Sequence, residues 1–263
     1  MELPRVPVLV LVIAAVLIFL AGFISAWTTI PPSRTADQDL LFQVSTYTSL
    51  SGGGYDPIEQ VRALMKNGDL GLGTFTGLDG EMVVVDGTCY QVTSDGIARQ
   101  ADPSLGVPFA GVTFFSPDLL VPGITAGNMT ELTGFIDTRL PSKDQFYAIR
   151  ITGHFPYIRA RSPPAQDKPY PPLADALKEQ SVYEFRNVTG TAAGFYTPAS
   201  AAGIGFPGYH LHFLTGDRSR GGHILDMTTA GNTVELDGTP RLTVILADDR
   251  APVRAAGRGE DRP

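Results

Sequence analysis

Three of the four histidines of this chain lie close together in the sequence, as His210, His212 and His223. Side chains at alternate positions of a β-strand project from one face, so His210 and His212 can both reach one point in space. His223 would come from the neighbouring strand, after a tight turn through Asp217 to Gly222. Three imidazoles without a cysteine partner are the ligand set of a catalytic zinc ion with an open position. The pattern therefore predicts a metal site, with zinc first on ligand type, although imidazole also suits iron, copper, manganese or nickel.

The simpler alternative for this segment is an ordinary amphipathic strand. His210 and His212 would then lie on its solvent face, while Tyr209, Leu211 and Phe213 point into the core. A lone His-x-His pattern favours that alternative, whereas a third histidine on the next strand favours metal binding.

Two further segments carry groups that suit catalysis. Thr74 and Glu81 flank a glycine-bounded turn, and Glu81 enters the strand that follows it. A general acid or base has to be held firmly beside a pocket, and a strand entry does this better than a loop tip. Arg150 lies in the apolar segment Tyr147–Ile151, where a guanidinium suits bidentate binding of a substrate carboxylate. From spacing alone, the simpler interpretations are favoured: a solvated Glu81 after a plain turn, and an exposed Arg150 on an alternating strand.

Strand patterns dominate the part of the chain that would position these groups. The pair Asp86-Gly87 separates two β-rich runs and predicts a tight hairpin. A helix is predicted from Pro57 to Met65, because Asp56 suits the N-cap and Pro57 suits the first helical position. Further helices are expected within residues 123–139 and 172–180. The predicted fold class is α+β, with two sheet-rich domains, mostly antiparallel or mixed sheets and a few helices.

A proline-rich stretch, residues 162–172, is the predicted divider between the two domains. The N-terminal α+β domain would span residues 39–161, and the C-terminal sheet domain, residues 173–263, would carry the histidine cluster. A linker, residues 30–38, would precede them.

The N-terminal residues 1–29 are predicted to form a transmembrane anchor or a signal peptide. No charged residue occurs from Val6 through Trp27, which is long enough to cross a bilayer as a helix. A signal peptide usually has an apolar region of only ~7–15 residues, but Ile24-Ser25-Ala26 would be a tolerable cleavage site. Both readings place the folded body outside the cytoplasmic membrane, either anchored to it or secreted after loss of residues 1–26.

Composition excludes several other classes. A hydrophobic content of 43% over 263 residues can build a core without covalent staples. The single cysteine, Cys89, excludes an intrachain disulfide and a thiolate metal cage. The formal charge of −7 and the scattered arginines argue against nucleic acid as a partner.

Four segments taken together closely resemble the α-acetolactate decarboxylase family: Leu41–Thr46, Gly71–Met82, Phe146–Ile151, and Gly208–Phe213 with Gly222-His223. The resemblance runs from about residue 40 to about residue 246 in the family's order. It implies a two-domain α+β fold, a homodimer, and one zinc ion between the domains. It also implies conversion of acetolactate, 2-hydroxy-2-methyl-3-oxobutanoate, to acetoin and carbon dioxide.

The same resemblance implies roles for individual residues. It implies that the zinc ligands are His210, His212 and His223. It also implies that Glu81 and Arg150 line the reaction centre and that Thr74 supports the site. The metal would then serve as an electron sink by polarising the ketone. We expect Arg150 to orient the leaving carboxylate or a substrate oxygen, and Glu81 to control proton delivery.

The chain departs from the family pattern at its C-terminus. Family members carry a further glutamate there that reaches the metal, and the acidic candidates here are Asp248, Asp249 and Glu260. Two other functional classes stay open from the residues alone: a zinc hydrolase that uses metal-activated water, and a non-catalytic sheet domain that binds a small ligand.

Overall fold

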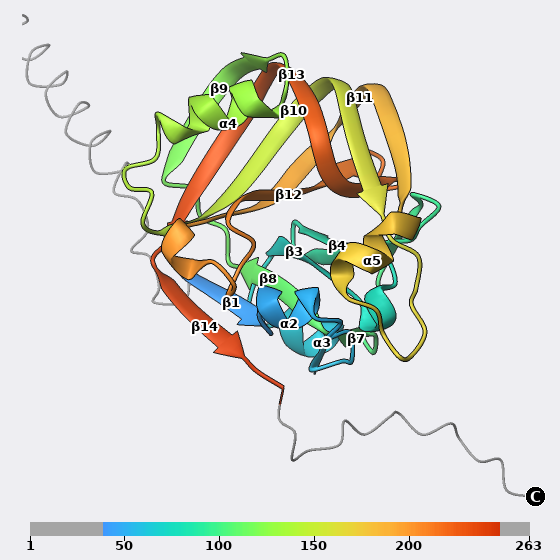
Figure 1. Cartoon of the computed structure of the whole chain (residues 1–263). Coiled ribbons are helices and arrows are strands. Elements are labelled where there is room, and N and C mark those ends of the chain that lie inside the picture. Colours follow the sequence, from blue (N-terminus) through green and yellow to red (C-terminus); the bar gives the residue numbers. More distant parts are fainter. Residues whose placement is uncertain (1–38, 248–263) are drawn as a thin grey trace, which may run out of the picture. The chain divides into compact units, whose positions relative to one another are not determined.

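The computed structural model describes residues 39–247, where strands far outnumber helices (Figure 1). The fold is sheet-rich α+β with few helices, as the strand patterns predict. None of the helices in this range has the length and apolar character needed to span a bilayer. The predicted anchor or signal, residues 1–29, and the linker, residues 30–38, lie outside the described residues.

A seven-stranded sheet carries most of the N-terminal half, in the order β14-β1-β8-β3-β4-β5-β6. Strands β1 and β14 are parallel, and every other neighbouring pair is antiparallel. The strands are β1 (Leu40–Val44), β3 (Leu70–Thr74), β4 (Glu81–Val85), β5 (Thr88–Val92), β6 (Ala98–Gln100), β8 (Phe109–Thr113) and β14 (Arg241–Ile245). The β4–β5 hairpin turns at Asp86 and Gly87, which both have positive φ, as an Asp-Gly type I′ turn requires. The predicted hairpin is thus confirmed.

The second sheet is built from longer, strongly curved strands, seen in green to red in Figure 1. Its order is β10-β11-β12-β13-β9, and β13 also pairs with β10, so the sheet curls back on itself. The strands are β9 (Leu119–Ala126), β10 (Phe146–Ser162), β11 (Ser181–Thr197), β12 (Gly208–Thr215) and β13 (Gly221–Thr239). Helix α4 (Met129–Asp137) buries Leu132 and Ile136 in the core of this sheet.

A second apolar core joins the two sheets. Leu72 and Val83 come from the seven-stranded sheet, and Ala148, Phe195 and Leu214 come from the five-stranded sheet. Burial of these side chains stabilises the contact between the two sheets, by about 25 cal/mol for each Å² of apolar surface removed from water. Side chains at the edge of this interface are therefore held in place by both sheets.

The remaining elements are short. They are α2 (Tyr47–Ser51), α3 (Val61–Leu64), α5 (Leu173–Ala176), the 3₁₀ turns η1 (Thr76–Leu78), η2 (Leu177–Glu179) and η3 (Ala199–Ala201), and a two-residue ladder between β2 (Glu59–Gln60) and β7 (Gly106–Val107).

The helix predicted from Pro57 to Met65 is largely wrong. Only the single turn α3 forms, because the preceding backbone pairs with β7: the Ile58 amide donates to the Val107 carbonyl at 3.0 Å. Sequence reasoning also missed α2, which Thr46 caps by accepting a hydrogen bond from the Ser49 amide. In both places, pairing or capping partners decided the structure over apolar periodicity.

Sheet membership does not follow the proline-rich stretch at residues 162–172. Strand β9 and all of β10 but its last residue precede it but belong to the five-stranded sheet, and β14 follows it but belongs to the seven-stranded sheet. The chain therefore passes from the first sheet to the second and back again. The division into residues 39–161 and 173–263 stays a prediction.

Candidate metal and active site

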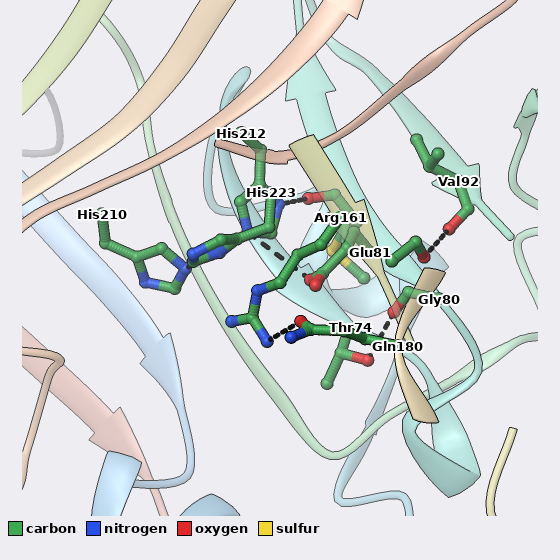
Figure 2. Close-up of polar contacts among 11 residues, drawn as sticks. Thr74, Gly80, Glu81, Val92, Arg161, Gln180, His210, His212 and His223 are labelled. Carbon is green, nitrogen blue, oxygen red and sulfur yellow. Dashed lines mark hydrogen bonds and ion pairs between the residues drawn. The ribbon is translucent and has the colours of Figure 1, made fainter. Parts of the chain in front are cut away.

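The three histidines meet at one point, on the face of the five-stranded sheet that is turned towards the seven-stranded sheet. Leu211 of β12 packs into the core of the curled sheet, so the flanking His210 and His212 project from the opposite face. His223 on β13 is the direct cross-strand partner of His212. Figure 2 shows the three rings turned towards one another.

The ring nitrogens have the spacing of ligands around one ion. His210 Nε2 lies 3.2 Å from His212 Nε2 and 3.1 Å from His223 Nδ1, and the last two atoms are 3.2 Å apart. A tetrahedral ion with bonds of ~2.0–2.1 Å separates its ligand atoms by about 3.3–3.4 Å. The observed triangle fits such an ion, and these histidines are the cluster of metal-binding side chains that residues 39–247 bring together.

The protonation of the triad favours metal binding. Burial lowers the pKa of His212 to about 3 and lowers the pKa values of His210 and His223 well below the usual range, with smaller contributions from neighbouring positive charge. The imidazoles are therefore neutral near pH 7. His212 Nδ1 donates to the Met82 carbonyl at 2.7 Å, which fixes the tautomer and leaves Nε2 as the lone-pair donor.

Glu81 approaches the triad from the seven-stranded sheet. It is the first residue of β4, and its Oε2 lies 3.5 Å from His212 Nε2. Its side chain is almost fully buried, and this burial raises its pKa to about 7, against an opposing effect of the positive Arg161. Glu81 can therefore hold or release a proton near neutral pH, which a general acid or base requires. The simpler interpretation, a solvated glutamate, does not describe this position.

Thr74 supports the turn that delivers Glu81. It is the cross-strand partner of Glu81, and its buried hydroxyl donates to the Gly80 carbonyl at 2.7 Å. Gly80 has φ +81°, and a Cβ there would lie 2.3 Å from the Val92 carbonyl oxygen. The turn therefore depends on glycine at 80, and Thr74 fixes the strand entry rather than presenting a free hydroxyl.

Arg150 lies elsewhere. Its guanidinium forms a two-pronged ion pair with Glu235 on β13, with Nε to Oε2 at 2.6 Å and Nη2 to Oε1 at 2.9 Å. It also stacks on Phe115, with Cζ 4.7 Å from the ring centroid, and lies 3.7 Å from Asp86. The structure thus places Arg150 in an ion-pair network and not among the residues that line the site.

Arg161 lines the site instead, and sequence reasoning missed it. Along β10, Ile151 and Phe155 face the core of the curled sheet, but beyond Pro156 it is Ile158 and Ala160 that do so. The alternation therefore changes phase near Pro156, which leaves Arg161 facing the histidines as the strand partner of His223. A proline inside a strand pattern was the available signal, because such prolines mark irregularities.

These residues surround a cavity of about 200 Å³. Its polar wall is formed by Thr74, Glu81, Arg161 and the three histidines, and its apolar wall by Tyr47, Leu50, Leu78, Phe109, Pro163, Leu173, Leu177 and Phe206. Pockets for drug-sized ligands are ~300–1,000 Å³, so this one suits a molecule of few atoms. The fourth histidine, His154, is exposed on β10 and does not line the cavity.

Comparison with known proteins decides the family. Residues 41–254 match the model of the α-acetolactate decarboxylase family. The chain belongs to this family. It is 46% identical over 210 residues to an α-acetolactate decarboxylase of Methanosarcina mazei, covering 80% of this chain and 73% of the relative. With that of Bacillus subtilis it shares 42% identity, covering 74% of this chain and 77% of the relative.

Solved structures agree with the sequence match. The crystal structure of the B. subtilis α-acetolactate decarboxylase has a TM-score of 0.78 and 39% identity, covering 80% of this chain and 90% of that one. A Staphylococcus aureus protein described as similar to α-acetolactate decarboxylase has a TM-score of 0.77 at 28% identity. The acidic tail candidates Asp248, Asp249 and Glu260 lie outside the described residues, so their role at the metal stays a prediction.

Proposed function

We propose that this protein is a carbon-carbon lyase that decarboxylates acetolactate to acetoin with the help of a zinc ion. The observation that carries the proposal is the convergence of three neutral imidazoles, a buried carboxyl group and a guanidinium on one small cavity. Membership of the α-acetolactate decarboxylase family supports the choice of substrate.

Zinc is the metal that best suits this ligand set. Three imidazole nitrogens with tetrahedral spacing and an open fourth position match catalytic zinc sites. When bound there, the ion would supply a Lewis acid for the ketone oxygen of the substrate.

Arg161 supplies the charge that a carboxylate substrate needs. In residues 39–247 no carboxylate forms an ion pair with its guanidinium, and Glu81 interacts with it only at longer range, so the guanidinium is available to a substrate carboxylate. A bound substrate carboxylate would be oriented by charge-assisted hydrogen bonds. This orients the carbon-carbon bond that breaks.

Glu81 handles the proton. Loss of carbon dioxide leaves an electron pair on the carbon that carried the carboxylate, and that carbon must be protonated to give acetoin. Glu81 is buried beside the histidines on the wall of the cavity, where its carboxyl group can deliver a proton to one face of that carbon. We therefore expect a single acetoin enantiomer.

The apolar wall keeps water from the reacting carbon. Leu50, Leu78, Leu173 and Phe206 would pack against the methyl groups of the substrate while its oxygens face the polar wall. Exclusion of water also strengthens the electrostatic contacts of Glu81 and Arg161.

Incubation of the zinc-loaded protein with racemic acetolactate tests the proposal. Acetoin of one handedness, formed in proportion to bound zinc, is the expected result. Zinc-loaded protein that forms no acetoin would favour the hydrolase alternative, and protein that purifies without metal and cannot be loaded would favour a non-catalytic ligand-binding domain.

We also propose that residues 1–29 carry the enzyme across the cytoplasmic membrane, on the strength of the uncharged apolar run from Val6 through Trp27. Fractionation of cells that express the whole chain, with protease added outside, tests this. Protein in the membrane fraction that is digested from outside indicates an anchor, and soluble protein outside the cell that lacks residues 1–26 indicates a signal peptide. Intact cytoplasmic protein would contradict both.

We further propose a homodimer, which the family resemblance implies. Sedimentation equilibrium of the zinc-loaded protein tests it, with a mass close to twice that of one chain as the expected result and a monomer mass as the contrary one.

A further inference from the structure

The Arg161 guanidinium is held by a neutral group. Its Nη1 donates to the amide oxygen of Gln180 at 3.0 Å, and its buried Nε has no hydrogen-bond partner in the described part of the chain (Figure 2). The contrast with Arg150 on the same strand is direct, because there Glu235 accepts two hydrogen bonds and neutralises the cation.

Gln180 is itself firmly placed. It ends the turn η2, where its backbone amide donates to the Leu177 carbonyl at 3.3 Å. Two residues later Val182 pairs with Arg161 across the β10–β11 ladder. The backbone that carries the amide side chain is thus held between a turn and the strand that pairs with Arg161.

The same turn covers the cavity. Leu173 of α5 and Leu177 of η2 line its apolar wall, and Ala176 packs with Leu50 and Leu78 in the small cluster beneath. The position of Arg161 is therefore linked through Gln180 to the segment that covers the site.

We propose that Gln180 is a positioning residue that aims the Arg161 guanidinium at the substrate carboxylate without neutralising it. A glutamate at 180 would hold the guanidinium equally well but would compete with the substrate for its charge. An amide gives the geometry of a strong partner and leaves the cation available. The proposal rests on the proposed function, which supplies the carboxylate.

The test compares three variants of the zinc-loaded protein: Gln180→Glu, Gln180→Met and, as a control on the same turn, Glu179→Gln, whose side chain is exposed. The first adds a negative charge to Arg161, the second removes the hydrogen bond at nearly equal size, and the third changes a neighbouring charge that does not contact Arg161. Thermal unfolding of each variant establishes that it is folded.

The main readout is affinity for a carboxylate against affinity for a neutral ligand. Calorimetric titration with 2-hydroxyisobutyrate, an unreactive 2-hydroxy acid, should show binding weakened about ten- to a hundredfold in Gln180→Glu and about three- to tenfold in Gln180→Met. Binding of acetoin, which has no carboxylate, should be unchanged in both, and Glu179→Gln should match the wild type with both ligands. In turnover, the KM for acetolactate should rise more than kcat falls.

Other outcomes overturn the proposal. Equal losses for 2-hydroxyisobutyrate and acetoin would indicate a purely structural role, and so would a Gln180→Glu variant no weaker than Gln180→Met. Failure of the wild type to bind 2-hydroxyisobutyrate would show that Arg161 does not capture carboxylates. If Gln180→Glu does not fold, Gln180→Asn, whose amide is too short to reach Arg161, takes its place with the losses expected of Gln180→Met. A wild type that binds 2-hydroxyisobutyrate but forms no acetoin would refute the proposed function and leave the role of Gln180 to be decided by the titration.

Discussion

Two arginines on strand β10 should have different effects when each is changed to methionine. Arg161 lines the cavity, so Arg161→Met should lower kcat/KM for acetolactate while leaving stability nearly unchanged. Arg150 is bound to Glu235 away from the cavity, so Arg150→Met should lower stability while leaving kcat/KM of the folded enzyme nearly unchanged.

The structure sets the size of each effect. Loss of charge-assisted hydrogen bonds to a carboxylate costs about 3 kcal/mol, which corresponds to roughly a hundredfold in kcat/KM. In the Arg150–Glu235 pair, the side chains are 27% and 11% exposed, which lies between the surface and buried cases. Removing Arg150 should therefore cost about 2–3 kcal/mol, or about 4–12 °C in Tm for a body of this size.

Steady-state acetoin formation and thermal unfolding of the zinc-loaded variants give both numbers. Arg161→Lys is the matched control, because it keeps the charge without the planar fork and should fall between the wild type and Arg161→Met. Arg161→Met with unchanged kcat/KM would refute the assignment of Arg161 to the site, and Arg150→Met with strongly reduced kcat/KM at full stability would refute the placement of Arg150 outside it.

Three further predictions concern the cluster itself. Glu81→Gln should keep zinc but lower kcat by about 10²- to 10⁴-fold, and full turnover at normal zinc content would remove Glu81 from proton transfer. His212→Ala should lose zinc and activity together. A chelator should likewise remove zinc and activity from the wild type, and activity should return when zinc is restored. Metal analysis alongside the activity assay checks both predictions. Metal-free protein should lose stability as the pH falls below ~6.5, because the unfolded chain then binds protons that buried His210, His212 and His223 do not. The loss is up to about 1.4 kcal/mol per pH unit for each imidazole, and Glu81, whose raised pKa lets the folded chain bind a proton first, offsets about one of the three. Thermal unfolding between pH 8 and pH 5 tests this, and a flat Tm would contradict it.

The parts of the structure that were predictable are those fixed by neighbours in the sequence. The Asp86-Gly87 hairpin formed as expected, because its turn geometry depends on those two residues alone. His210 and His212 share a face because the strand period is two, and this required no knowledge of the rest of the fold.

The parts that were not predictable depend on distant partners. The apolar periodicity of residues 57–65 suggested a helix, but the backbone of the first half of this segment is hydrogen-bonded to β7 instead. Arg161 joins the site only because the alternation of β10 changes phase near Pro156, and that shift depends on the strands to either side. A uniform strand would have put Arg150 and Arg161 on opposite faces, so counting residues along the strand could not have placed Arg161 in the site.

The hydrogen bond from His212 to the Met82 carbonyl has a consequence for mutagenesis. The acceptor is a main-chain oxygen, so replacing the Met82 side chain leaves it in place, and a scan of side-chain substitutions would record position 82 only as a packing residue. Side-chain mutagenesis therefore cannot test the carbonyl oxygen that selects the metal-binding tautomer of His212. Its contribution would become measurable by chemical synthesis, with an ester in place of the peptide bond between Met82 and Val83 to weaken the carbonyl as an acceptor.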